Sequence, residues 1–171
     1  LEALILSYNG INALRQHLRD DVRFHGFITR GGDAPTRVPE STKAEVLVRA
    51  ADTPYAMEVL GKVRAWAEGA ALATGARLEF GEAGPGYEAR LPNPILVSLF
   101  KDNLIALGRE VELATGNERL GSSDIGNVSQ VVPAIHPYIA IGPEEIGGHT
   151  AEFEKASASP AGHDGLIHAA K

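Results

Sequence analysis

Apolar positions along the first 50 residues predict a helix followed by two strands. In residues 4–18 they recur every three or four positions, which places them on one face of a helix. These positions are Leu4, Tyr8, Ile11, Leu14 and Leu18. Residues 22–29 and 43–50 instead alternate apolar with polar side chains, as half-buried strands do. The glycines and proline of residues 31–35 predict a tight connection between these strands.

The next 40 residues complete the pattern of a small α+β domain. Residues 53–75 predict a second helix, because Thr53 suits its N-cap, Pro54 its first turn and Gly75 its C-cap. Residues 76–91 predict strand material interrupted by a Gly/Pro loop. The order helix, strand, strand, helix, strand is that of a two-layer α+β sandwich, an antiparallel sheet with both helices on one face. One further strand is expected before residue 1.

A second domain is expected after Pro92-Asn93-Pro94, where two prolines punctuate the chain. Residues 93–108 have the apolar spacing of a helix. A polar loop is predicted at 121–129, followed by an apolar segment at 131–141 and by two short helices, one after His149 and one after Gly162. We therefore expect domains at 1–92 and 93–171.

Composition narrows the classes of function. Hydrophobic residues make up 44% of the 171, enough to bury a core. Lys and Arg number 16 against 22 Asp and Glu, a formal net charge of -6 without a basic stripe, which argues against a nucleic-acid partner. No apolar stretch approaches the roughly 20 residues that span a bilayer, so no membrane partner is expected. The lack of cysteine excludes thiol chemistry within these residues and agrees with a reducing compartment such as the cytoplasm.

Strand alternation assigns His25 to the sheet face away from Phe24 and Ile28, and the same face carries Arg49. One interpretation is a solvated polar face. The other is a surface that binds an anion or a carboxylate, since arginine offers a bidentate fork and histidine donates hydrogen bonds. The pattern leaves both open.

His149 follows two glycines and precedes Thr150, a natural N-cap residue, so it is expected at the mouth of a helix. The helix dipole there favours a neutral imidazole, which is the form that ligates metals. One histidine is a weak metal signal on its own. The remaining histidines are interpreted as surface or core residues: His17, His136, His163 and His168.

Taken together, these segments resemble the zinc-dependent amidohydrolase and peptidase family of aminoacylases, carboxypeptidase G and p-aminobenzoyl-glutamate hydrolase. The resemblance extends over nearly the whole chain in the family's order. The segments that carry it are Asn12-Ala13-Leu14-Arg15-Gln16, Arg23-Phe24-His25-Gly26, Gly31-Gly32, Val38-Pro39-Glu40, Val48-Arg49-Ala50, residues 121–129, residues 133–137 and Gly148-His149-Thr150.

The resemblance implies an α+β lid inserted into an α/β catalytic domain that holds two divalent metal ions, zinc foremost, with manganese or cobalt as alternatives. Lids pair to form a homodimer. Residues 1–92 would be the lid without its first strand, and 93–171 the C-terminal part of the catalytic domain. His149 matches the last metal ligand, His25 the lid histidine that stabilises the oxyanion in the partner subunit's site, and Arg49 an arginine associated with the substrate carboxylate. Thr36 stands where the family usually has asparagine, which puts recognition by that turn in doubt.

The implied reaction is metal-assisted hydrolysis of an amide in an N-acyl amino acid, an aminobenzoyl-glutamate-like compound or a dipeptide. The other metal ligands and a glutamate base are expected upstream of residue 1, so the chain alone is expected to be inactive. The alternative is a non-catalytic α+β module for dimerisation or small-ligand binding. A third possibility is a truncated product that folds poorly.

Overall fold

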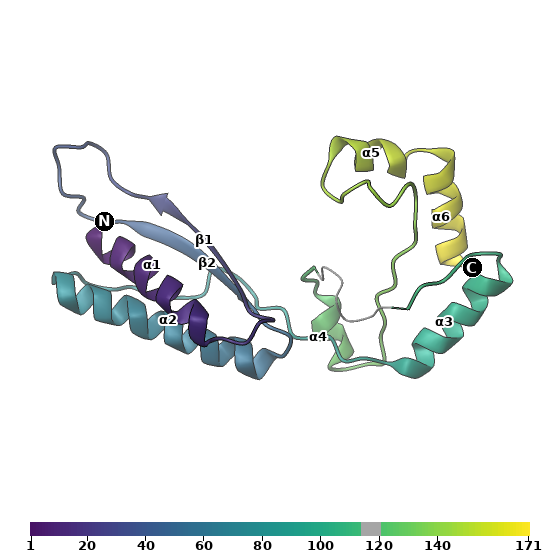
Figure 1. Cartoon of the computed structure of the whole chain (residues 1–171), viewed down its shortest axis with the longest axis horizontal. Coiled ribbons are helices and arrows are strands. Elements are labelled where there is room, and N and C mark those ends of the chain that lie inside the picture. The colour runs from purple at the N-terminus through teal and green to yellow at the C-terminus, as the bar shows by residue number, and fades with distance from the viewer. Residues whose placement is uncertain (114–120) are drawn as a thin grey trace. The chain divides into compact units, whose positions relative to one another are not determined.

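The computed structural model describes residues 1–113 and 121–171, and the chain divides into two compact units (Figure 1). Unit 1 is Leu1–Ala89 and unit 2 is Arg90–Lys171. The division comes slightly before the Pro92 boundary predicted from sequence. The roles of the two parts as lid and catalytic domain stay predictions, and each unit is described by itself.

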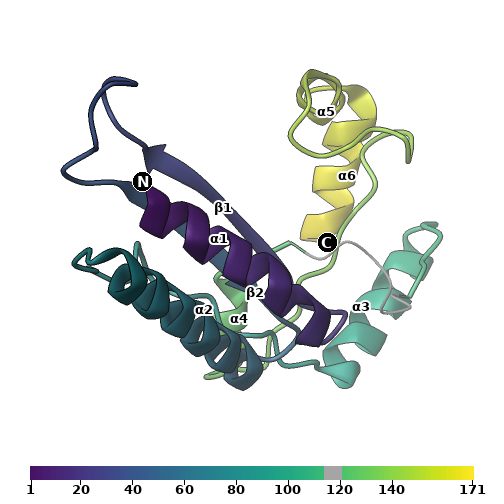
Figure 2. The ribbon, with the colours of Figure 1, turned by 60° about the vertical axis from the view of Figure 1, so that its left-hand side comes forward.

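Unit 1 is a two-layer α+β structure, as the apolar pattern predicted. Its elements in chain order are α1 (Glu2–Leu14), the 3-10 helix η1 (Arg15–His17), β1 (Arg23–Arg30), β2 (Lys43–Arg49) and α2 (Thr53–Thr74). The two strands are antiparallel, and α1 and α2 lie side by side (Figures 1 and 2). Ile11 from α1, Phe24 from β1 and Val63 from α2 pack together as the core. Both helices therefore cover the Phe24 face of the sheet.

The predicted third strand is wrong, because residues 76–91 form no strand and the described sheet consists of β1 and β2. Side chains attach this segment to unit 1 instead. Phe80 packs against the core cluster, and the Arg64 guanidinium lies 5.6 Å from the centre of its ring. Near the other end, the Ala89 N–H donates to Thr53 Oγ1 at 2.8 Å. Apolar alternation indicates an extended segment, but a strand also needs a ladder of backbone hydrogen bonds.

The N-terminus of α2 is capped by Asp52 and not by the Thr53 that the sequence suggested. Asp52 accepts a hydrogen bond from the Tyr55 N–H at 2.8 Å, and Gly75 ends the helix in the left-handed conformation that was expected there. Asp52 also forms an ion pair with Arg19 at 2.9 Å, and the Arg19 guanidinium lies 3.8 Å from the centre of the Tyr55 ring. Asp52 thus caps α2 and also connects it to Arg19, in the segment that follows η1.

Unit 2 contains helices and no strand among its described residues. They are α3 (Pro94–Ala106), α4 (Ile125–Ser129), α5 (Ala151–Ser157) and α6 (Pro160–Ala170). The segment predicted as a polar loop therefore includes a short helix, in which buried Ser129 accepts from the Leu91 N–H at 3.0 Å. The last helix begins at Pro160, before the Gly162 that was predicted to precede it.

The extended parts of unit 2 are attached to its helices by side-chain hydrogen bonds. Arg109 donates from Nε to His168 Nδ1 at 2.9 Å and from Nη1 to the Ala140 carbonyl at 3.2 Å. Several apolar side chains of α3 are exposed, including Ile95 at 72%. The place of this unit in a larger α/β domain stays a prediction. Among the described residues of the chain, no helix combines the length and the apolar character that crossing a bilayer requires.

The contact between α1 and α2 depends on a glycine in the middle of α1. Gly10 is buried, and a Cβ atom added there would overlap the six-membered ring of Trp66. The Asn9-Gly10 pair, which weakens a helix by propensity, is therefore the place where the Trp66 ring of α2 packs directly against α1.

We expect Gly10→Ala to lower the free energy of unfolding of unit 1 by about 1–3 kcal/mol, because the Trp66 ring must move out of its packed position. Gly69→Ala on α2 is the matched control, since nothing lies within 4 Å of a Cβ there. It should stabilise the helix by about 0.5–1 kcal/mol. Thermal unfolding followed by fluorescence of Trp66, the single tryptophan of the chain, measures both. Equal midpoints for the two variants would contradict this account of Gly10.

Candidate functional site

His25 and Arg49 lie on the same face of the β1–β2 sheet. The strand register pairs His25 with Leu47 and Arg23 with Arg49, and directly paired residues project to the same side. Phe24 projects to the opposite side, where it is buried under the helices. We call the side that carries His25 and Arg49 the outer face. Their roles in binding and catalysis stay predictions.

The outer face combines positive charge with exposed apolar surface. Arg23 is the cross-strand partner of Arg49, so two basic residues lie next to each other at this end of the face, although the Arg23 guanidinium donates to the Asp20 and Val22 carbonyls. Phe27 and Leu47 on the same face are 62% and 47% exposed. A ligand with an anionic group and an apolar part would suit this surface.

Arg49 has an unsatisfied hydrogen-bond donor. Its Nε is buried and has no hydrogen-bond partner within the part of the chain that the structure describes. Leaving a buried donor unpaired costs about 1–3 kcal/mol, and more for a charged group. A carboxylate is the ligand that a guanidinium pairs with in a bidentate manner. The hydrogen bonding of Arg49 is therefore incomplete among the described residues, and a ligand would reach its Nε only if the side chain moved.

Behind His25, a half-buried tyrosine, Tyr8, lies against the sheet. A Cβ atom at Gly26 would lie 2.9 Å from Tyr8 Oη and 3.0 Å from the Glu45 carbonyl oxygen, so the glycine leaves room for the tyrosine. The hydroxyl is buried, without a hydrogen-bond partner among the described residues. Burial raises the pKa of Tyr8 above its ordinary value of 10.0. Sequence reasoning assigned Tyr8 to the apolar stripe but missed its contact with the strand that carries His25.

Thr36 lies in the β1–β2 connection, far from Arg49. The connection turns at residues 34–37, where the Arg37 N–H donates to the Ala34 carbonyl at 3.2 Å, and Thr36 is exposed. The connection joins β2 at Lys43, whereas Arg49 ends this strand, a separation of about 20 Å along its length. Within unit 1, the structure thus brings His25 together with Arg49 but not with Thr36.

His149 has an unusual backbone conformation in unit 2. Its φ is 64°, a left-handed value, and its side chain is exposed. For a non-glycine residue this conformation costs about 1–2 kcal/mol, and such strained residues concentrate at functional sites. The next residue, Thr150, caps α5 as expected by accepting from the Phe153 N–H at 3.2 Å. The sequence analysis did not predict that His149 itself adopts the left-handed conformation.

The described residues do not form a metal centre by themselves. Among them, no group of three or more His, Cys, Asp or Glu side chains could hold a metal ion. His149 is exposed and could supply one nitrogen ligand, so any centre that used it would need ligands from elsewhere.

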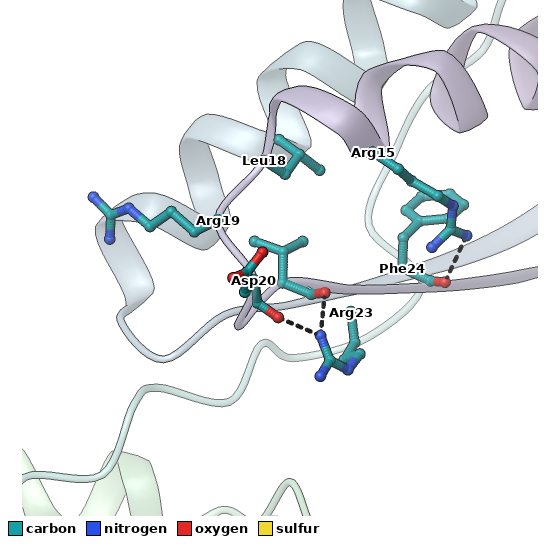
Figure 3. A pocket seen from close by; sticks show the side chains of 7 residues that line it. Arg15, Leu18, Arg19, Asp20, Arg23 and Phe24 are labelled. Carbon is teal, nitrogen blue, oxygen red and sulfur yellow. Dashed lines mark hydrogen bonds between the residues drawn. The ribbon is translucent and has the colours of Figure 1, made fainter. Parts of the chain in front are cut away.

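A hollow next to β1 is lined in part by arginines that donate hydrogen bonds to backbone carbonyls of the chain itself (Figure 3). It is lined by Arg15, Leu18, Arg19, Asp20, Val22, Arg23 and Phe24. Arg15 Nη2 donates to the Phe24 carbonyl at 3.1 Å. Arg23 Nη1 donates to the carbonyls of Asp20 and Val22 at 2.6 and 2.9 Å. These bonds, which Figure 3 shows as dashed lines, hold the segment between η1 and β1 against the sheet.

Comparison with curated proteins identifies two relatives that are alike in name. The mouse (Mus musculus) protein named Xaa-Arg dipeptidase is 34% identical over 173 residues, an alignment that covers 100% of this chain and 40% of the mouse protein. The chain is similar to dipeptidases. The human (Homo sapiens) protein of the same name is also 34% identical, over 161 residues that cover 93% of this chain and 37% of the human one. No protein-family model matches the chain.

The chain thus spans about two fifths of the length of these dipeptidases. A dipeptidase hydrolyses an amide bond, so the similarity agrees with the broad resemblance to amidohydrolases and peptidases. It does not bear on aminoacylase, carboxypeptidase G or p-aminobenzoyl-glutamate hydrolase as individual members.

The buried Tyr8 hydroxyl predicts a loss of stability at high pH. Because the folded pKa of Tyr8 is raised above 10.0, ionisation favours the unfolded chain as pH rises past that value, and has no effect well below it. Tyr8→Phe removes this titration. We expect the variant to gain stability relative to the parent between about pH 9 and about pH 11. Trp66 fluorescence melts at several pH values measure the difference, and parallel pH curves for the two proteins would show that Tyr8 is not involved.

Proposed function

We propose that this chain forms part of a metal-dependent hydrolase that cleaves the amide bond of a dipeptide or a related N-acyl amino acid with a free carboxylate. The similarity of the whole chain to two proteins named Xaa-Arg dipeptidase carries the proposal. Dipeptides that end in arginine are therefore the first substrates to test. Zinc is the favoured metal, with manganese or cobalt as alternatives.

In this proposal Arg49 binds the carboxylate of the substrate. Its buried Nε has no partner among the described residues, and its cross-strand partner on the same face is a second arginine, Arg23. A carboxylate would accept hydrogen bonds from the guanidinium and reduce the repulsion between the two arginines.

His25 donates a hydrogen bond to the oxygen that becomes negative as the amide carbonyl is attacked. It is a diagonal neighbour of Arg49 across the sheet, so the two Cβ atoms lie about 7–8 Å apart. The carboxylate and the amide carbonyl of one dipeptide can then reach the two side chains together. As the family resemblance implies, His25 would act in the site of a partner subunit, in a homodimer formed through the lid.

His149 supplies one ligand of the metal centre in this proposal, from an exposed position next to the N-cap of α5. Two bound divalent ions would polarise the carbonyl and activate a water molecule. Further ligands and a glutamate base would come from residues other than those described, so the 171-residue chain alone should be inactive.

A second candidate is a non-catalytic module for dimerisation or small-ligand binding. The exposed Phe27 and Leu47 on the outer face favour it, because apolar side chains on an uncovered sheet also suit an interface.

Activity measurements separate the two candidates. A longer gene product that contains this chain is expected to hydrolyse an Xaa-Arg dipeptide, to lose activity with a chelator and to recover it with zinc, manganese or cobalt. The 171-residue chain is expected to show no turnover under the same conditions. Absence of metal binding and of turnover on dipeptides and N-acyl amino acids in the longer protein would favour the non-catalytic module.

Replacing His25 tests the assigned role directly. His25→Ala should lower kcat by about 10²–10³-fold while bound metal is retained, as loss of an oxyanion donor does. His17→Ala is the matched control, because His17 is an exposed histidine on η1. Subunit mixing then tests action across the dimer: His25→Ala and His149→Ala subunits, each inactive alone, should regain activity together. An unchanged kcat for His25→Ala would exclude the role.

A further inference from the structure

The outer face carries one acidic side chain among basic and apolar ones. Four residues of β2 project onto this face, namely Lys43, Glu45, Leu47 and Arg49. From β1 come Arg23, His25 and Phe27. Within the two strands, Glu45 is the single carboxylate on this side, and its side chain is 44% exposed.

Glu45 and Arg49 lie on opposite sides of His25. The register pairs Phe27 with Glu45 and His25 with Leu47, so Glu45 is a diagonal neighbour of His25, as is Arg49 in the other direction along β2. Each diagonal separates the Cβ atoms by about 7–8 Å, and Glu45 is about 13 Å from Arg49 along the strand. A carboxylate, an imidazole and a guanidinium thus follow one another across one exposed surface.

We propose that Glu45 determines specificity by binding the cationic side chain of the substrate's C-terminal residue, a guanidinium or an ammonium group. The inference rests on the proposed function. With the substrate carboxylate on Arg49 and the scissile carbonyl on His25, the side chain of the C-terminal residue branches between these two groups and can extend along β2 toward Glu45. A carboxylate and a guanidinium form two parallel hydrogen bonds, so arginine would be favoured over lysine.

Phe27 adds a second reason for a cation at this position. It is the cross-strand partner of Glu45, and its ring is 62% exposed on the same face. The face of an aromatic ring attracts a guanidinium, and its apolar surface covers the methylene groups that precede the charge. Glu45 and Phe27 together offer both contacts that an arginine side chain makes.

In the structure, Glu45 forms an ion pair with Lys43. The Lys43 Nζ lies 3.5 Å from Glu45 Oε1, with the two side chains 69% and 44% exposed. An ion pair this exposed contributes little to stability, so a bidentate guanidinium can replace the lysine. The exchange returns the Lys43 ammonium to water.

The test compares a dipeptide ending in arginine with the same dipeptide ending in leucine, in the longer protein that contains this chain. Glu45→Gln should lower the ratio of kcat/KM for arginine over leucine at least about tenfold, mainly through KM for arginine. Glu45→Lys should move the preference toward a dipeptide ending in glutamate. Glu68→Gln on α2 is the matched control, since it removes the same charge from another exposed pair, with Arg64 at 2.9 Å.

Each outcome decides something different. If the parent hydrolyses both dipeptides and Glu45→Gln keeps the same ratio, the specificity role is overturned while the proposed function stands. An equal loss on both substrates would assign Glu45 to the structure of the face and would also overturn it. If the parent hydrolyses neither dipeptide but cleaves an N-acyl amino acid, this inference fails while the proposed function stands. Without turnover on any of these substrates, both fail.

Discussion

Packing of Phe24 against Ile11 and Val63 decides the arrangement of unit 1, because it covers one side of a two-stranded sheet and leaves the other side open. A sheet of two strands has little stability without such cover. Since side chains alternate along a strand, burial of Phe24 directs His25 to the open side, and the cross-strand register adds Arg49 and Glu45 there. A shift of one residue in register would bury the polar set and expose the core.

The open side differs from an ordinary solvated sheet in its charge and in its unpaired donor. The whole chain has a formal net charge of -6, yet this face carries several basic side chains and one carboxylate. Charges of one sign that face each other across strands destabilise the folded state, which argues for a ligand that offsets them. The buried Nε of Arg49 points to the same kind of ligand. In the proposed function, this surface would bind a small charged substrate during hydrolysis of its amide bond.

The sequence predicted those features that follow from periodicity and missed those that depend on contacts between distant residues. Alternation correctly assigned His25 and Arg49 to one face, and helical spacing correctly identified α1 and α2. The prediction of a strand in residues 76–91 was wrong, because this segment is attached to unit 1 by the Phe80 side chain and not by a ladder of backbone hydrogen bonds. The sequence also suggested the wrong N-cap for α2. Asp52 is identified as the cap by its hydrogen bond from the Tyr55 N–H, which the residue order alone does not show.

Individual residues also show that contacts between distant parts of the chain are not predictable from local sequence. The importance of Gly10 depends on Trp66, more than fifty positions later, and is not visible in α1 alone. Glu45 alternates with the apolar positions of residues 43–50, but its position beside His25 follows only from the register of the hairpin. The composition of the 121–129 segment suggested a loop, whereas the Ser129 hydroxyl and the Leu91 backbone make it part of a folded structure.

The left-handed backbone at His149 narrows the substitutions that evolution can explore at this position. Besides glycine, the residues that tolerate this conformation best are asparagine, aspartate and histidine, and β-branched side chains are nearly excluded. Each of these three polar residues carries an oxygen or nitrogen atom that can donate an electron pair. Apart from changes to glycine, neutral drift at residue 149 would therefore exchange one coordinating side chain for another, so the local conformation favours retention of a coordinating group even without selection on activity.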